Sequence, residues 1–232
     1  AVLVLNFSAN PTGYSPVRSE VAAIVAAITA HPLPLAVVCD DAYQGLFFEA
    51  DVFDKSLFGP LARAADPART LVCKVDGATK ELVFFGGRVG FLTFSAPGRA
   101  GEALVEKAAV IGRSTICSAS APAQSAVLSA LRSPTLPAEQ KTVHAILMER
   151  YRALMGALHA AGLDPAPCNS GCFAMIRLPA HLDADVIRKR LIAEQSVGTI
   201  AIPSANGIRI AFCSMEAADI PDLVRRIAEI AH

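Results

Sequence analysis

Two side chains that could act together follow the apolar run of residues 34–39. Asp40 stands at the end of this run, and Tyr43 comes three residues later in the segment CDDAYQG. Ligands of open α/β sheets bind beyond the carboxyl ends of the strands. A carboxylate and a phenol placed there could address two points of one flat heterocycle. The alternative is that Asp40 or Asp41 caps a following helix, which is a common role for Asp.

Lys80 lies in a turn, GATKE, between two apolar runs at residues 70–75 and 89–94. A lysine held in such a place can attack a carbonyl and form a Schiff base. An exposed loop lysine is the alternative. The other lysines are Lys55, Lys74, Lys107, Lys141 and Lys189, and most of them stand in polar or helical contexts that indicate solvated side chains.

Two arginines have positions suited to anions. Arg88 follows two glycines and opens the run RVGFLTF, where its planar guanidinium could meet a phosphate bidentately. The alternative for Arg88 is a surface arginine in a plain hairpin. Arg209 lies within the alternating pattern NGIRIAFC, which would point it to one face between apolar neighbours. Because an unpaired charge is costly there, we expect an anionic partner, either a protein carboxylate or a ligand carboxylate.

These residues are distributed over strands that alternate with helices. Residues 1–6, 34–39, 70–75 and 89–94 are apolar runs, and continuous apolar runs are typical of strands covered on both faces. Residues 17–30 and 100–112 carry helical spacing of apolar side chains. The alternation predicts an α/β fold with a largely parallel sheet.

The pattern changes after about residue 125, and we place a boundary near residue 130, within the segment RSPTLPAE. The sequence therefore predicts two domains, residues 1–128 and residues 129–232. A long helical pattern opens the second one, which reads as a small α+β domain. Its expected elements are helices at 138–161, 184–195 and 216–231 and strands at 172–178, 197–202 and 207–212.

Composition and charge favour a small-molecule ligand. The 21 basic and 21 acidic residues leave no excess charge that would attract nucleic acid or an anionic membrane. No apolar run approaches the roughly 20 residues that span a bilayer. Cys168 and Cys172 lack the second Cys/His pair of a zinc site, and the cysteines fit a reducing, cytoplasmic compartment. The chain begins directly on an apolar run without Met, which indicates that further sequence precedes it.

The ordered set ANPTG, DDAYQG and Lys80-x7-Arg88, with Arg209 further on, resembles the fold-type I pyridoxal-phosphate aminotransferases of class I/II. The first segment looks like that family's NPTG motif and the second like its D-x-A-Y segment. The spacing of Lys80 and Arg88 matches the distance from the family's Schiff-base lysine to its phosphate-binding arginine. The resemblance covers essentially the whole chain. It implies the C-terminal part of a large, mainly parallel-sheet cofactor domain, followed by a small C-terminal domain.

The resemblance implies the cofactor pyridoxal 5′-phosphate, bound covalently by Lys80, which would also move the proton between substrate and cofactor. Asp40 would pair with the pyridinium nitrogen. Tyr43 and Asn10 would hydrogen-bond the phenolic oxygen, and Arg88 would bind the phosphate. Arg209, with Asn10 beside it, would bind the substrate α-carboxylate.

The implied reaction transfers an amino group between an amino acid and a 2-oxo acid. Arg113 resembles the arginine with which aspartate aminotransferases reach the partner subunit's site and bind a distal carboxylate, which implies an acidic amino donor. An interface or helix-end arginine is the alternative there. The active sites of the family lie at a dimer interface, so the resemblance also implies a homodimer for the full-length protein.

The sequence departs from the family pattern in two ways. Gly77 stands where family members often carry a serine that contacts the phosphate, and Thr79 could serve instead. Roughly the first half of the family's chain has no counterpart, including its phosphate cup, the aromatic stacked on the pyridine ring and the N-terminal arm. The chain alone could therefore bind the cofactor weakly or not at all.

Three other functions stay open at this point. A lyase, decarboxylase or acyl-transferring synthase of the same fold would share Lys80, Asp40 and Arg88. An aminotransferase-like domain of a transcription regulator would need a DNA-binding module upstream. A catalytically silent fragment would be incomplete whatever its parent does.

Overall fold

The computed structural model describes residues 1–231, which form two compact units that are each discontinuous in sequence. The first unit comprises residues 1–8, 16–45 and 51–140. The second comprises residues 9–15 and 46–50 together with the chain from Lys141 onward. The change at residue 140 falls inside helix α6 (Leu136–Ala160). The predicted boundary between domains after residue 128 stays a prediction.

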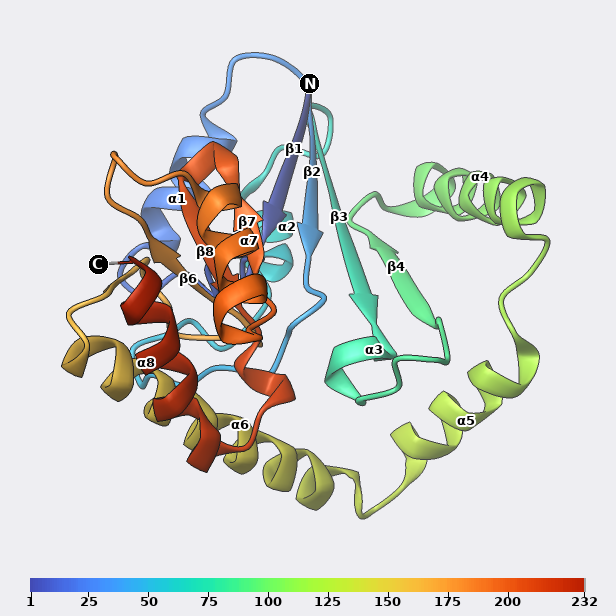
Figure 1. The fold of residues 1–232 in the computed structure, drawn as a ribbon. Coiled ribbons are helices and arrows are strands. Elements are labelled where there is room, and N and C mark those ends of the chain that lie inside the picture. Colours follow the sequence, from blue (N-terminus) through green and yellow to red (C-terminus); the bar gives the residue numbers. More distant parts are fainter. Residues whose placement is uncertain (232) are drawn as a thin grey trace. The chain divides into compact units, whose positions relative to one another are not determined.

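The first unit contains a four-stranded sheet in the order β1-β2-β3-β4 (Figure 1). Strands β1, β2 and β3 run parallel, whereas β4 pairs antiparallel with β3. This confirms the predicted α/β fold with a mainly parallel sheet. The strands are β1 (Val2–Asn6), β2 (Leu35–Asp40), β3 (Thr70–Gly77) and β4 (Gly90–Phe94).

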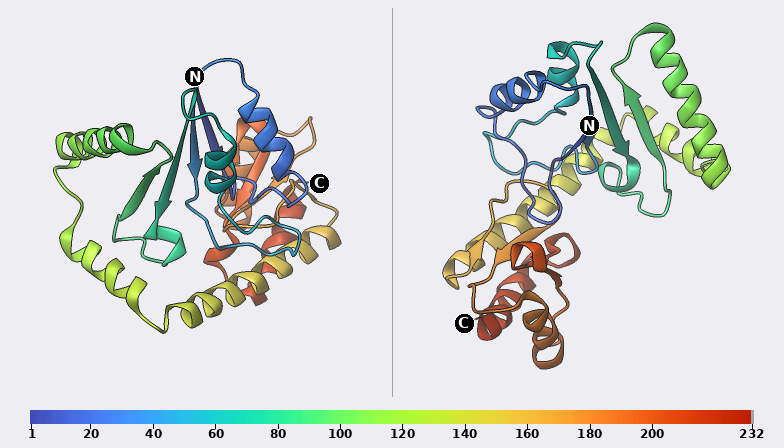
Figure 2. Two further views of the ribbon diagram at one scale, coloured as in Figure 1. Left: turned by 180° about the vertical axis from the view of Figure 1, so that it is seen from behind. Right: turned by 90° about the horizontal axis from the view of Figure 1, so that it is seen from above.

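One face of this sheet is covered by helices α1 (Val21–Thr29) and α2 (Phe58–Ala64), which lie over the strands in the view from behind (Figure 2). Val37, Leu61 and Val72 are fully buried in the core between them. On β1 the other face is open, because Val2 and Val4 are 71% and 59% exposed. The prediction that the strand of residues 1–6 is covered on both faces is therefore wrong within the described part of the chain. There β1 is an edge strand, and α1 and α2 cover only one face of the sheet.

Three further helices of the first unit come after β3 in the chain. Helix α3 (Ala78–Glu81) is a single turn between β3 and β4. Helix α4 (Gly98–Ile116) buries no side chain, and α5 (Ala121–Arg132) packs through Ala123 and Val127 against Ala78 and Val89. The sequence did not predict α5, which spans the predicted change of pattern near residue 125. The predicted linker shrinks to residues 133–135 between α5 and α6.

The second unit contains an antiparallel sheet in the order β5-β6-β8-β7 and confirms the predicted α+β region. Its helices α7 (Ala184–Gln195) and α8 (Ile220–Ala231) match the predicted ones closely, and Asp183 caps α7 by accepting hydrogen bonds from the backbone N–H groups of Asp185 and Val186. The strands are β5 (Asp164–Pro165), β6 (Ala174–Arg177), β7 (Ile200–Ile202) and β8 (Gly207–Ile210), with the 3-10 turns η1 (Pro203–Ala205), η2 (Phe212–Ser214) and η3 (Ala217–Asp219).

The core of this unit follows from helical spacing. Helix α8 buries Ile220, Val224 and Ile227, which recur every three or four residues and so share one face. The aromatic ring of Tyr151 on α6 stacks on Phe48 with 4.8 Å between ring centroids. Within residues 1–231, no helix combines the length and the apolar character that a bilayer crossing requires.

Candidate active site

The carboxylate of Asp40 is fixed at the C-terminal ends of β1 and β2. The register pairs Asn6 with Asp40, and the Asn6 side-chain amide donates a hydrogen bond of 2.7 Å to Asp40 Oδ2. The backbone N–H of Ala42 donates to Oδ1 at 3.3 Å. Residues 41–45 form a turn and the next helix, α2, begins only at Phe58, so the alternative role of Asp40 or Asp41 as a helix cap is wrong.

Lys80 lies on α3, where its side chain is partly buried between two aromatic rings. Its Nζ is 5.1 Å from the centroid of the Tyr43 ring and 5.3 Å from that of Phe85. Tyr43 itself is only 7% exposed. A cation at this distance is attracted to the ring face and is held by it. The structure therefore brings together Tyr43 and Lys80, two residues that the sequence analysis selected separately, and contradicts an exposed loop lysine.

Arg88 bends back toward α3 instead of extending away from the turn. Its backbone adopts a left-handed conformation, with φ of 52°, next to Gly87. Its Nη1 donates to the Phe85 carbonyl oxygen at 3.3 Å and to Thr79 Oγ1 at 3.5 Å. The Arg88 guanidinium thus lies next to the Thr79 hydroxyl. Thr79 directly precedes Lys80 in the chain. The role of Thr79 toward a phosphate stays a prediction.

Arg209 forms a second group of candidate residues, within the second unit. It lies on β8 between the buried residues Ile208 and Ile210, as the alternating pattern predicts. Its Nη1 donates to Asn10 Oδ1 at 2.9 Å, and its guanidinium carbon is 4.2 Å from the centroid of the Phe173 ring. Its Nε is buried without a hydrogen-bond partner, and no Asp or Glu of residues 1–231 forms an ion pair with it. The expected protein carboxylate is therefore not the partner of Arg209 within the described chain.

The segment ANPTG reaches Arg209 because it docks on the segment CNSGC of the same unit. The Gly13 carbonyl oxygen accepts hydrogen bonds from the backbone N–H groups of Asn169 and Ser170, at 2.9 and 2.8 Å. Gly13 has a φ of +75°, and a Cβ there would overlap the Phe173 carbonyl oxygen and Cys168 Sγ. Glycine is required at this position for both reasons.

Sequence reasoning missed part of this group. It treated CNSGC only as a question of metal binding, whereas the Asn-Ser-Gly turn is the anchor of the NPTG segment. Phe173 and Phe85, which contact Arg209 and Lys80, carried no signal beyond being aromatic residues beside a predicted strand and turn. No three His, Cys, Asp or Glu side chains of the described chain gather closely enough to hold a metal ion.

Arg113 stays apart from the other candidates of the first unit. It is exposed in the last turn of α4, and no hydrogen bond or ion pair of the described residues joins it to Asp40, Lys80 or Arg88. Its position agrees with the helix-end alternative as well as with a role toward another molecule.

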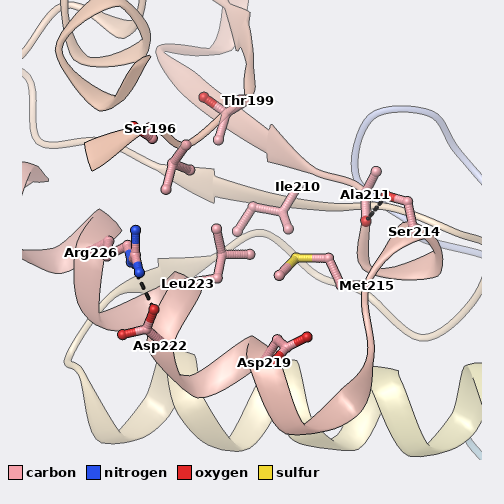
Figure 3. Close-up of a pocket in the computed structure, with 12 residues that line it drawn as sticks. Ser196, Thr199, Ile210, Ala211, Ser214, Met215, Asp219, Asp222, Leu223 and Arg226 are labelled. Atoms are coloured by element: carbon pink, nitrogen blue, oxygen red, sulfur yellow. Dashed lines mark hydrogen bonds and ion pairs between the residues drawn. The ribbon is translucent and has the colours of Figure 1, made fainter. Parts of the chain in front are cut away.

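The second unit also contains a cavity of about 460 Å³ between β8 and α8, and Figure 3 shows its lining. Leu223, Ile210 and Met215 form its apolar wall, and the ion pair of Arg226 with Asp222, 2.7 Å long, closes one side. None of the candidate residues lines it, since Ile210 faces the cavity while its neighbour Arg209 alternates to the other face of β8. The cavity is therefore separate from the candidate site.

A family profile and several solved structures match this chain. The family profile described as "Aminotransferase class I and II" matches residues 1–227. Among solved structures, an aromatic aminotransferase from Pyrococcus horikoshii matches with a TM-score of 0.80 at 18% identity, covering 99% of this chain and 59% of its own. A comparison with curated proteins found no match.

Two further solved structures agree in fold. An aminotransferase from Mycobacterium tuberculosis has a TM-score of 0.79 at 22% identity and is covered to 57% of its length, with 99% of this chain aligned. A double mutant of aspartate aminotransferase from Thermus thermophilus has a TM-score of 0.79 at 23% identity, covering 99% of this chain and 56% of its own. This chain thus spans somewhat less than three fifths of the length of these structures.

Proposed function

Because this chain belongs to the aminotransferase class I and II family, we propose that it is the part of a pyridoxal-phosphate-dependent transaminase that carries the cofactor-binding lysine, Lys80. The enzyme would transfer an amino group between an amino acid and a 2-oxo acid. The observation that carries this proposal is the position of Lys80 Nζ, 5.1 Å from the ring centroid of Tyr43 and 5.3 Å from that of Phe85, beside the sheet end where Asp40 is fixed.

The donor set of the first unit fits pyridoxal phosphate. The cofactor has an aldehyde, a pyridine nitrogen, a phenolic oxygen and a phosphate, and each of them has a chemically matched group in the chain. An amine suits the aldehyde, a carboxylate the ring nitrogen, a phenol the phenolic oxygen and a guanidinium the phosphate. In the same order, these groups belong to Lys80, Asp40, Tyr43 and Arg88.

Asp40 would bind the ring nitrogen and keep a proton on it. When bound, pyridoxal phosphate supplies an electron-withdrawing ring that accepts the electron pair left at the substrate α-carbon. The Asn6 amide holds Oδ2 of Asp40 by a 2.7 Å hydrogen bond, which restricts rotation of the carboxylate. Asp40 can therefore present a fixed acceptor instead of turning into solvent.

Lys80 would bind the cofactor covalently through Nζ and then, once displaced by the amino substrate, move a proton from the substrate α-carbon. The rings of Tyr43 and Phe85 limit where Nζ can go. Arg88 and Thr79 would bind the phosphate, and their contact at 3.5 Å lets both approach one oxyanion.

Arg209 would bind the α-carboxylate of the substrate, supported by Asn10. Its buried, unpartnered Nε marks a donor that lacks an acceptor within the described chain, and a carboxylate can accept from two guanidinium N–H groups at once. Asn10 keeps one terminal nitrogen in place at 2.9 Å. Phe173 supports the guanidinium plane. In this proposal Asn10 also contacts the phenolic oxygen of the cofactor.

The finer parts of the proposal concern the amino donor and the assembly. We propose that Arg113 recognises a distal carboxylate across the interface of a homodimer, so that the donor is an acidic amino acid. The exposed position of Arg113 at the end of α4 supports a role toward another subunit.

The proposal is tested by locating the cofactor on the protein. The full-length protein is incubated with pyridoxal phosphate, reduced with borohydride and digested, and the modified lysine is identified by peptide mass. We expect the modification on Lys80, its loss in Lys80→Ala and its persistence in Lys55→Ala, which alters an exposed lysine of the same unit. Modification that survives Lys80→Ala at the wild-type level would rule out the assignment. Release of a 2-oxo acid from an amino donor then separates transamination from lyase or decarboxylase chemistry.

A further inference from the structure

The sheet of the first unit carries a charged cluster on the face opposite Asp40. Side chains alternate between faces along a strand, so Asp40 and Asp41 point in opposite directions. The register pairs Cys39 with Lys74 and Asp40 with Val75, and paired residues share a face. Lys74, Asp76 and Asp41 therefore lie on the rear face, toward the core that α1 and α2 cover.

Lys74 joins the ends of two neighbouring strands on this rear face. Its Nζ lies 2.6 Å from Asp76 Oδ1 and 3.8 Å from Asp41 Oδ2. The Lys74 side chain is 24% exposed, that of Asp76 16% and that of Asp41 6%. Lys74 is partly buried because β3 carries it onto the covered face.

The cluster lies where β2 and β3 separate. The Asp41 backbone N–H donates to the Val75 carbonyl oxygen at 2.9 Å and continues the β2–β3 pairing one residue beyond β2. Beyond this point one chain turns to Tyr43 and the other passes through Gly77 into α3 and Lys80. Lys74 therefore holds the two strand ends at the last place where they are still joined.

The cluster holds more negative than positive charge. Asp41, Asp76 and Glu81 all interact with the one ammonium of Lys74, and Asp40 adds a further charge from the front face. Burial raises the pKa of Asp41, and the charges of Asp76 and Asp40 add to this, while a Ser56 hydrogen bond and Lys74 oppose it. Burial lowers the pKa of Lys74, but its hydrogen bond to Asp76 and the surrounding carboxylates outweigh this and raise it.

Cys39 is a further titratable group on this face, and its partner in the register is Lys74. Burial raises its pKa to about 12, so it stays a neutral thiol at physiological pH. Lys74 is thus the one cation among the groups named here, and its loss would leave Asp41 buried and unneutralised.

We propose that Lys74 is a positioning residue of the active site: by neutralising Asp41 and Asp76 it clamps the ends of β2 and β3, and so fixes Asp40 and Tyr43 relative to Lys80. This rests on the proposed function of Lys80 and Asp40. Lys74 touches neither substrate nor cofactor in this role, and acts through the strand ends.

The charge part of the clamp is tested on the full-length protein without added cofactor. Lys74→Met keeps the length of the side chain and removes its charge, so the pKa of Asp41 in the folded protein rises further above its unfolded value of about 3.9. A carboxyl with a raised folded pKa costs stability as pH rises above the unfolded pKa. We expect the unfolding midpoint of Lys74→Met to match the wild type near pH 5 and to lie roughly 5–10 °C below it at pH 8.

Two further variants test whether the charge of Asp41 causes this difference. Lys74→Arg should restore most of the midpoint at pH 8, and the double variant Lys74→Met/Asp41→Asn should remove the part of the pH dependence that Asp41 causes, while Asp76 keeps its charge. Lys107→Met, which alters an exposed lysine on α4, is the control and should match the wild type throughout. A midpoint difference that is equal at pH 5 and pH 8, or failure of both Lys74→Met variants to fold at either pH, would overturn the charge role.

The positioning part is tested by the dissociation constant for pyridoxal phosphate at pH 7. The double variant has the net charge of the wild type but no clamp, so we expect it to bind the cofactor about tenfold more weakly than the wild type, with Lys74→Arg within about threefold. If the double variant binds pyridoxal phosphate as tightly as the wild type, Lys74 only stabilises the fold through its charge, and its positioning role is overturned. If the wild type itself forms no reducible bond at Lys80, the proposed function fails, and the pH-dependent midpoints still decide whether the clamp exists.

Discussion

Lys80 and Tyr43 meet within the first unit although they stand on different elements, with the Lys80 Nζ 5.1 Å from the centroid of the Tyr43 ring. The contact exists because Tyr43 follows the end of β2 and Lys80 follows the end of β3, and these two strands are parallel neighbours. Parallel strands deliver the residues after them to the same edge of a sheet. The topology of the sheet thereby brings an amine and a phenol to one place.

This contact predicts different effects for two substitutions of Tyr43. Tyr43→Phe keeps the ring beside Lys80 and removes the phenol, whereas Tyr43→Leu also removes the ring face. We expect Tyr43→Phe to bind pyridoxal phosphate several-fold more weakly with little change in the unfolding midpoint. Tyr43→Leu should lose more affinity and also some stability, because a large buried side chain shrinks. Fluorescence titration with the cofactor measures the affinity of each variant, and urea unfolding measures its stability. Equal affinity of Tyr43→Phe and the wild type would show that the phenol does not contact the cofactor.

Arg209→Lys should impair the enzyme through substrate binding. Lysine keeps the charge but lacks the fork that meets a carboxylate bidentately, and loss of a charge-assisted hydrogen bond costs about 1.5–3 kcal/mol. We therefore expect kcat/KM for amino donors to fall roughly 10- to 150-fold, with most of the change in KM. Arg177→Lys, on the neighbouring strand β6, is the matched control, because Arg177 is exposed and pairs with Asp164 at the surface. A loss of similar size in both variants would point to a general effect on the sheet.

The sequence predicted where the candidate residues of the first unit lie along its strands and turns, because these signals are local. Asp40 and Tyr43 follow an apolar run, and Lys80 and Arg88 flank a turn beside glycines, so residue type and spacing carry most of the information. The alternating pattern around Arg209 likewise predicted its strand correctly. These features depend on a few neighbouring residues, and local periodicity describes them.

The rest depends on contacts between distant segments, which spacing does not describe. The sequence predicted no role for Lys74, and only the β2–β3 register shows that it faces Asp41. Phe173 carries no mark of its contact with Arg209 beyond its residue type. The role of Gly13 follows from the carbonyl oxygen of Phe173, far along the chain.

Arg113→Ala tests the identity of the amino donor. If Arg113 binds a distal carboxylate, the variant should lose at least tenfold in kcat/KM with aspartate or glutamate and much less with alanine, because only the acidic donors lose a charged partner. Steady-state kinetics of the full-length enzyme with the three donors measures this ratio. Equal losses for all donors would assign Arg113 a structural role at the end of α4.

Gly13→Ala should destabilise the protein through the anchor of the segment that carries Asn10. The substitution places a Cβ against the Phe173 carbonyl oxygen and Cys168 Sγ, and it forces alanine into a φ of +75°, which alone costs about 1–2 kcal/mol. With the overlap added, we expect urea unfolding to show a loss of about 2–4 kcal/mol. Gly156→Ala is the matched control, since Gly156 lies within α6 with open space around its Cβ position. Alanine there should stabilise by about 0.5–1 kcal/mol.

The anchor also holds Asn10 against Arg209, so folded Gly13→Ala should show a raised KM for amino donors while Gly156→Ala keeps the wild-type value. Unchanged stability and KM in Gly13→Ala would show that the segment ANPTG does not depend on its contact with CNSGC.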